Sequence, residues 1–172
     1  MKQHHVFSFL QRMGKSFMLP IAVLPVAGIF LGVGSSLTNE TTIAALHLES
    51  VLGQGTFLYS VLILLKQVGK VLFDNLPLIF AVSIALGMSK RRKEVAALAA
   101  IIAFFVMHAT INTLLCLDGS IVNGVVSNYI LDGSITSVCG MLSLEMGVFG
   151  GIVVGLGVSF LHNHFYQIQL QN

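Results

Sequence analysis

The stretch Val95 to Leu115 constrains this chain more than any other, because it is long, apolar and free of charge. A helix needs about 20 predominantly apolar residues to cross the hydrocarbon core of a bilayer, and VAALAAIIAFFVMHATINTLL meets that length. Only 9% of the whole chain is charged, whereas a soluble domain has about 25% charged residues. A chain of 172 residues exposes too much surface for so few charges to solvate. The sequence therefore excludes a soluble domain and predicts a membrane protein.

Three further stretches are apolar enough, or nearly so, to cross a membrane. We expect them at about 17–37, 70–89 and 147–165, in addition to 95–115. All should be helices, because an open strand in lipid leaves its backbone N–H and C=O groups without partners. Residues 1–15 place apolar side chains around one side of a helix, as in a segment that lies along the membrane surface. The predicted fold class is all-α: a polytopic membrane protein with about four transmembrane helices and an N-terminal amphipathic helix.

The charged residues predict the topology of these spans. Basic residues precede the first span and follow the second: Lys2, Arg12 and Lys15, then Lys90, Arg91, Arg92 and Lys93. The loops 38–56 and 116–146 contain acidic residues and no Lys or Arg. Because basic loops stay in the cytoplasm, both termini and the basic run are expected inside. The N-terminal segment is expected to be retained, since no clean signal-peptidase site follows the first apolar run.

The region 57–88 is longer than one span requires. Measured back from Lys90, a span reaches Lys70, so residues 57–70 either lie near the outer interface or belong to one tilted, kinked helix. Pro77 lacks a backbone donor and clashes with the preceding turn, which places a kink or break here. In a membrane such a break is tolerated where protein buries it or a wet cavity lies beside it.

Polar residues within or beside the spans are the candidates for a functional site. Asp74 and Asn75 either line a substrate path or form an interfacial cap, with Asp74 paired to Lys70. His108 either lines a path or bonds to a neighbouring helix. Both interpretations are open for each residue.

Glycines recur at a spacing typical of close helix packing. Gly147, Gly151 and Gly155 form a doubled GxxxG pattern, and Gly28 and Gly32 repeat it in the first span. Small residues at this spacing let two helix backbones approach closely. The partner helix belongs either to this chain or to a second subunit.

Several chemistries are not indicated by the sequence. His162 and His164 point to different faces of a helix and do not form a chelate. The two cysteines, Cys116 and Cys139, form no metal motif, although both lie in the second outer loop. We find no catalytic triad, no paired carboxylates and no basic surface for nucleic acid, and we expect no cofactor and no metal.

Four segments carry a resemblance to a known family. They are Leu10 to Leu37, Val68 to Ser89 with its Asp-Asn-Leu-Pro break, Glu94 to Met107, and Met146 to Leu170 with its Gly-Gly and His-Asn-His-Phe-Tyr. In this order they resemble the membrane permease subunit, IIC, of the bacterial sugar phosphotransferase system, in its glucose/maltose/N-acetylglucosamine branch.

The resemblance implies a function in the cytoplasmic membrane. The family imports a sugar, which a phosphocysteine on the IIB domain phosphorylates on the inner side, supplied by IIA and other phosphohistidine carriers. IIC is a homodimer whose first half is a scaffold and whose second half holds the sugar. A IIC permease is about twice as long as this chain. The family's Ile-Thr-Glu-Pro motif and the IIB cysteine motif are not found, so no catalytic residue is carried over, and enzymatic activity of this chain is left open.

The residues and the resemblance together leave three hypotheses for the function of the chain. The chain is the N-terminal scaffold part of a IIC permease, incomplete without its C-terminal half or a second subunit. Alternatively, it is a stand-alone membrane scaffold or regulator that packs against longer permeases through Gly151 and its neighbours. A third hypothesis is a small pore built by oligomerisation around His108 and Asn112.

Overall fold

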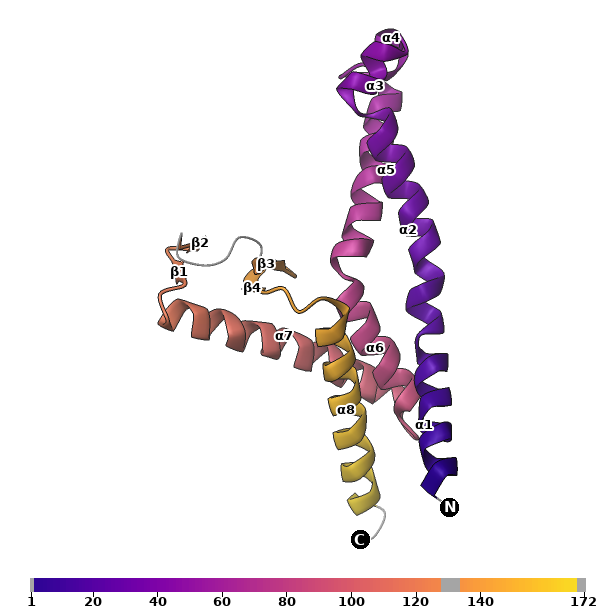
Figure 1. Cartoon of the computed structure of the whole chain (residues 1–172), viewed down its shortest axis with the longest axis vertical. Coiled ribbons are helices and arrows are strands. Elements are labelled where there is room, and N and C mark those ends of the chain that lie inside the picture. Colours follow the sequence, from indigo (N-terminus) through magenta and orange to yellow (C-terminus); the bar gives the residue numbers. More distant parts are fainter. Residues whose placement is uncertain (1, 128–133, 170–172) are drawn as a thin grey trace. The chain divides into compact units, whose positions relative to one another are not determined.

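The computed structural model describes residues 2–127 and 134–169, with side chains for 6–127 and 134–166. The acidic residue Asp132 of the loop 116–146 lies outside this part. The elements follow in order: α1 (Lys2–Ser16), α2 (Met18–Leu37), α3 (Glu40–Ala45), α4 (Glu49–Leu52), α5 (Phe57–Asp74), α6 (Leu76–Met88), α7 (Lys93–Leu117), β1 (Ile121–Val122), β2 (Val125–Val126), β3 (Ile135–Val138), β4 (Met141–Leu144) and α8 (Gly147–Gln169). Figure 1 shows a chain that is mostly helical, in agreement with the predicted fold class.

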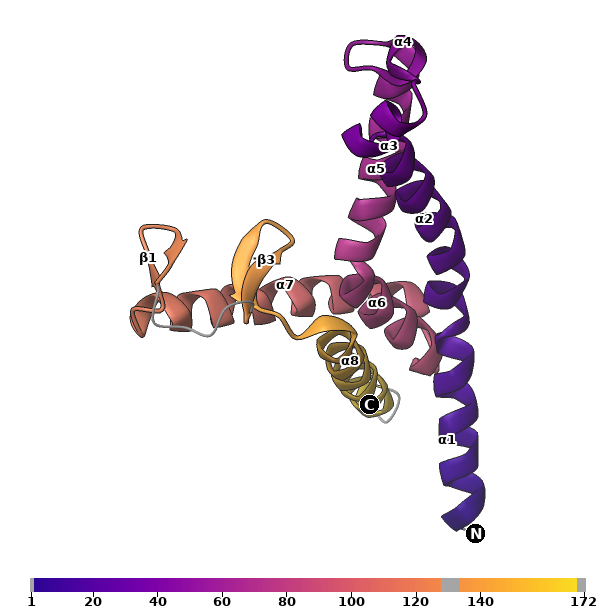
Figure 2. The ribbon, with the colours of Figure 1, turned by 45° about the horizontal axis from the view of Figure 1, so that its top comes forward.

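The chain divides into two compact units, residues 21–74 and residues 1–20 with 75–172. In the smaller unit, α2 and α5 lie side by side, as Figures 1 and 2 show. Two glycines allow this approach: Gly34 lies against the backbone of Lys66, and Gly69 lies against the backbone of Leu31. The short helices α3 and α4 contribute to an apolar cluster of Ile43, Leu52 and Leu62.

The break between α5 and α6 falls where the sequence predicts it. Helix α5 ends at Asp74, Asn75 is not helical, and α6 begins at Leu76 with Pro77 in its first turn. Proline is tolerated there because the first N–H groups of a helix have no intrahelical acceptor. The proline therefore starts α6 rather than kinking a continuous helix.

The larger unit is built around α6, α7 and α8, with α7 crossing the other two helices (Figures 1 and 2). Small residues form the crossing: Ala85, Ala96 and Ala100 are buried together, with Val158 of α8 against them. Next to them, Phe104 of α7 packs with Ala81 of α6 and with residues of β3 and α8. Alanines at the crossing let the helix axes approach closely, which is how membrane helices gain packing contacts.

Helix α8 approaches α6 so closely that only glycine fits at the contact. A Cβ atom at Gly151 would overlap the carbonyl oxygen of Pro77, and one at Gly155 would lie 2.6 Å from that of Ala81. We call this contact the glycine seam. It lies within the chain, since α6 and α8 belong to the same unit.

Helix α1 also packs against α6. The hydroxyl of Ser83 donates to the carbonyl oxygen of Ser16, and the rings of Phe17 and Phe80 are 5.6 Å apart between centroids. The predicted N-terminal helix is therefore present, and its last turn is attached to the helical core of its unit.

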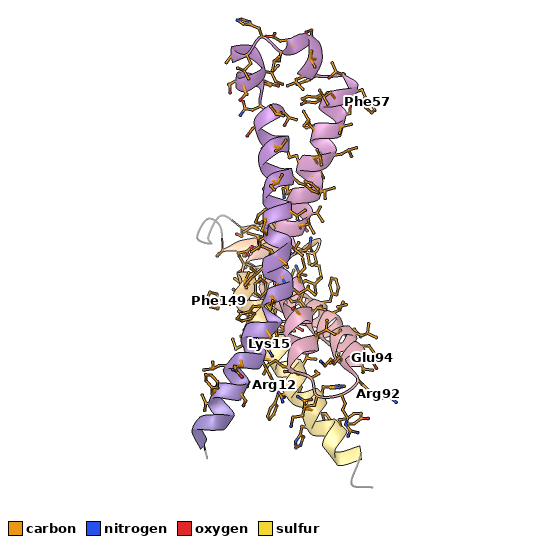
Figure 3. All side chains as sticks on the ribbon, turned by 90° about the vertical axis from the view of Figure 1, so that its right-hand side faces the viewer. Arg12, Lys15, Phe57, Arg92, Glu94 and Phe149 are labelled. Carbon is orange, nitrogen blue, oxygen red and sulfur yellow. The ribbon has the colours of Figure 1, made fainter. Side chains whose placement is uncertain are left out.

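The helices account for a multi-pass membrane protein. Among the described residues, Val6–Leu37, Lys93–Leu117 and Gly147–Tyr166 are long and apolar enough to cross a membrane, and α5 with α6 provides a fourth span if the pair is one span. Exposed apolar side chains along these helices, such as Phe149 (labelled in Figure 3) and Ile102, provide the surface that lipid solvates.

Two β-hairpins in the region 116–146 were not predicted. Strands β1 and β2 pair antiparallel, as do β3 and β4. Each hairpin has a two-residue turn with positive φ at both positions, Asn123-Gly124 and Cys139-Gly140. These are the φ values of a type I′ turn, for which Asn-Gly is a strong sequence signal. The signal is present in Ile-Val-Asn-Gly-Val-Val, so the first hairpin was predictable.

Substitution Gly155→Ala should destabilise the chain, although alanine normally favours a helix by about 1 kcal/mol over glycine. The new Cβ would lie 2.6 Å from the Ala81 carbonyl oxygen and 2.8 Å from the Ile84 Cβ, so α8 must move away from α6. Overpacking of this kind costs about 1–3 kcal/mol. Thermal unfolding in detergent, followed by helical circular dichroism, measures the effect.

Gly157→Ala is the matched control, because nothing lies within 4 Å of a Cβ at this position of the same helix. It should be neutral or stabilising. Equal melting temperatures for the two variants would contradict the glycine seam.

Candidate functional site

Polar side chains attach the β3–β4 hairpin to α7 and to the start of α6. We call this set of contacts the hairpin site. On the helical side it contains Asn75 and His108, two of the three predicted path residues, together with Asn112. Antiparallel pairing of β3 and β4 fixes the register, with Val138 opposite Met141, so Ser143 is directed to α7.

His108 is the most buried polar residue of the hairpin site on the helical side. Its side chain is 2% exposed, and its Nδ1 lies 2.7 Å from the hydroxyl oxygen of Ser143, which is 0% exposed. The ring of Phe104, one turn earlier on α7, lies 4.5 Å from the imidazole between centroids. Each polar group thereby satisfies the other in a place from which water is excluded, as buried polar groups require.

Two further bonds hold the hairpin in place. The amide Nδ2 of Asn112 donates to the carbonyl oxygen of Leu142 at 2.7 Å. At the turn, the thiol of Cys139 donates to Oδ1 of Asn75 at 3.4 Å. Val138, beside the turn, is buried in a cluster with Phe104. The hairpin therefore fills space between helices rather than extending freely from the membrane.

Asp74, the third predicted path residue, is not at the hairpin site. It ends α5, and its carboxylate pairs with Lys70 at 2.5 Å, with both side chains about half exposed (52% and 55%). An exposed pair with i, i+4 spacing contributes about 0.3–0.5 kcal/mol. This geometry matches the interfacial-cap interpretation of Asp74, and a role in a sugar path stays a prediction.

The predicted packing glycines occupy different environments. Gly151 and Gly155 form the glycine seam, whereas Gly147 begins α8 with φ +52° and has only the Glu145 side chain within 4.0 Å of its added Cβ. Nothing lies within 4 Å of a Cβ at Gly28 or Gly32. Contact of these last two with another chain stays a prediction.

The basic run Lys90–Lys93 spans the turn between α6 and α7 and the first residue of α7, and α8 holds this turn. Asn163 accepts from the backbone N–H of Lys90 at 2.9 Å and donates to the carbonyl oxygen of Met88 at 3.1 Å. His162 bonds through Nε2 to the carbonyl oxygen of Arg91 at 2.8 Å. The turn needs these partners because Arg92 adopts a left-handed conformation, with φ 44°, just before α7 begins.

Sequence reasoning missed this role of His162 and Asn163. It considered the two histidines of this segment only as metal ligands. The useful signal is the amide between them, since an asparagine side chain both donates and accepts and so can bond to a helix end and a turn together.

The described residues contain no group of three or more His, Cys, Asp or Glu side chains able to hold a metal ion. The hairpin site carries an imidazole, two amides, a hydroxyl and a thiol, each bonded to a partner in the chain. Such a set positions a loop on helices; nothing in its geometry presents an activated nucleophile to a substrate.

These features define a class: a multi-pass α-helical membrane protein with a tightly packed helical core and a structured hairpin before its last helix. The chain matches the family model described as phosphotransferase system, EIIC, over residues 14–172. It is 37% identical, over 165 residues, to the PTS system glucose-specific EIICBA component of Staphylococcus saprophyticus subsp. saprophyticus. The chain therefore belongs to the EIIC family of the phosphotransferase system, which confirms the resemblance seen in the sequence. The alignment covers 96% of this chain and 23% of that relative.

Ser143→Ala should loosen the hairpin from α7, because it leaves the buried imidazole of His108 without its partner. An unsatisfied buried polar group costs about 1–3 kcal/mol. On a Cys116→Ser background, the rate at which a maleimide modifies Cys139 measures the opening and should increase severalfold. Ser137→Ala, at an exposed position of β3, is the control and should leave the rate unchanged. Equal rates in all three proteins would show that His108 does not hold the hairpin.

Burial raises the pKa of the Cys139 thiol. The thiolate is the reactive form, so its alkylation should require a higher pH than that of an ordinary thiol, whose pKa is about 8.5. The folded state holds the proton of Cys139 more tightly than the unfolded chain does. The contribution of this thiol to the free energy of unfolding is therefore fully present below the pKa of the unfolded chain and is lost as the pH rises through the pKa of the folded state. The midpoint of alkylation rate against pH, in Cys116→Ser, should lie above that of an unburied thiol and move down in Ser143→Ala. A midpoint below the ordinary value would refute the effect of burial.

Proposed function

We propose that this chain is the N-terminal part of the sugar-translocating IIC permease of a phosphoenolpyruvate-dependent phosphotransferase system, which imports a glucose-type sugar and couples import to phosphorylation. The observation that carries this proposal is the family match over residues 14–172. The relative is glucose-specific, and the name EIICBA joins its permease to B and A components. Both points support a glucose-type sugar as substrate and IIB and IIA domains as partners.

The proposed location is the bacterial cytoplasmic membrane, with both termini and the Lys90–Lys93 turn on the inner side. The support is the distribution of charge, since basic residues flank one end of the spans and the loop 38–56 holds only acidic charges. A IIB domain would then meet the permease on the side where Lys90–Lys93 lies.

Within the permease, we assign this part to the scaffold. The support is that its buried polar side chains are bonded within the chain, as His108 is to Ser143, and that Gly151 and Gly155 fix α8 against α6. A scaffold needs helices that keep their distances while another part moves. The sugar-binding groups would then come from residues of the complete permease beyond this part.

A second candidate function is a stand-alone scaffold that packs against longer permeases. The observation that favours it is the open space beside Gly28 and Gly32, not Gly151, which the carbonyl of Pro77 already covers. No comparable observation favours a pore around His108 and Asn112, because the hairpin occupies both side chains.

A chimera tests the proposed function. This chain replaces the matching region of the S. saprophyticus glucose-specific EIICBA component in cells that lack their own IIC permeases, and the accumulation of labelled glucose phosphate is measured. The chimera should restore accumulation, whereas this chain expressed alone, with the phosphocarriers and a IIB domain present, should not. Gly151→Leu in the chimera should abolish uptake, and Gly157→Leu should not. Sugar phosphate formed with this chain alone would refute the assignment to a scaffold part.

A further inference from the structure

A groove of about 740 Å³ lies between α1, the α6–α7 turn and the C-terminal half of α8, all in the larger unit. We call it the basic groove. The side chains that matter for its chemistry are Phe9, Arg12, Lys90, Leu156, Phe160 and His164. Figure 3 shows Arg12 on α1, which belongs to the same unit as α8.

The charges of the basic groove all have one sign. Its two cations, Arg12 and Lys90, come from different elements, the imidazole of His164 lies with them, and no Asp or Glu lines the groove. The ion pair found among the described residues, Lys70–Asp74, lies in the other unit, so neither Arg12 nor Lys90 is paired in it. Converging cations without a counter-ion attract an anionic group.

The walls of the basic groove are apolar. Phe9 and Phe160 remain 45% and 72% exposed, and the ring of Phe160 stacks with the imidazole of His164 at 6.4 Å between centroids and 7° between planes. Leu156 extends the wall along α8 in the direction of its candidate span. A ligand with an anionic head and an apolar tail would contact both parts of this surface.

We propose that the basic groove binds an anionic phospholipid of the inner leaflet. The phosphate bonds to Arg12, Lys90 and His164, and an acyl chain lies along Phe9, Phe160 and Leu156. The cytoplasmic leaflet is anionic, and the basic residues place this end of the unit on that side. The lipid joins α1 to α8 and so stabilises the unit. The proposal goes beyond sugar import and rests only on the proposed membrane orientation.

Other occupants fit this surface less well. A free phosphate or a sugar phosphate would pair with the cations and leave the aromatic walls in water. A zwitterionic lipid would bring no net charge to offset Arg12 and Lys90. A second copy of this chain would bring a further basic end, because the same residues are repeated in it.

The test uses the full chain, purified in detergent and examined by native mass spectrometry during titration with phosphatidylglycerol, phosphatidylcholine or inorganic phosphate. The groove variant is Arg12→Gln with Lys90→Gln. Its matched control is Lys15→Gln with Lys93→Gln, which removes the same charge from exposed positions outside the groove. Helical circular dichroism and elution volume establish that each variant is folded.

The wild-type chain should prefer phosphatidylglycerol, and the groove variant should lose about tenfold to thirtyfold in affinity, as expected for two basic residues near a membrane surface. The control should change by less than about twofold, because its charges do not line the groove. Phe160→Ser should weaken the binding of phosphatidylglycerol and leave that of inorganic phosphate unchanged.

Three outcomes would overturn the proposal. Equal losses in the groove variant and its control would indicate general attraction to a basic surface. Displacement of phosphatidylglycerol by inorganic phosphate at similar concentration would indicate a soluble anion as the ligand. Conversion of a dimer to a monomer in the groove variant, with lipid binding unchanged, would indicate an interface between two copies.

Discussion

The larger unit depends on the backbone contact between α6 and α8. Lipid tails are as apolar as leucine, so membrane helices gain little from hydrophobic burial and associate through close packing. Gly151 and Gly155 provide that closeness, with α8 directly against the carbonyl oxygens of Pro77 and Ala81. Pro77 stands in the first turn of α6, so the break that begins this helix also sets where α8 meets it. The clusters around Phe80 and Phe104 both include residues of α6 and have α8 residues packed with them.

Polar bonds secure the same pair of helices at both ends. At the start of α6, Asn75 accepts from Cys139 of the hairpin that leads into α8. At the other end, Asn163 of α8 bonds to the backbone of Met88 and Lys90. Glycine contacts alone allow two helices to slide, because backbone surfaces are smooth. Amides at the ends remove this freedom, since a hydrogen bond is lost within a displacement of about 1 Å.

The sequence was sufficient for the all-α membrane fold class, the break and the family, and insufficient for the local contacts; the predicted span 70–89 is divided between the end of α5 and α6. The length of an apolar stretch and the position of Pro77 are properties of the sequence itself. A membrane helix and a helix break can therefore be predicted from them without knowledge of the fold. Which glycines touch a helix depends on rotation about the helix axis, which a GxxxG spacing does not fix. Gly34 and Gly69 are therefore the close contacts of α2 and α5, and Gly28 and Gly32 are not. The hairpin site was missed because it depends on a long-range contact. His108 bonds to Ser143, a residue 35 positions away in the sequence.

The hydrogen bonds of His108 and Asn112 indicate whether these polar residues of α7 are available to a ligand. An ionisable or amide side chain at membrane depth is a functional candidate by default, because its burial is costly. Here His108 and Asn112 are bonded to the hairpin, which offsets that cost without any ligand. A sugar site requires hydroxyl-binding groups that are free until the sugar arrives, whereas these groups are already engaged. Removing them from the hairpin to bind sugar would leave Ser143 buried without a partner. The arrangement thus supports the proposed assignment of this chain to a scaffold, in which His108 and Asn112 hold the hairpin rather than a sugar.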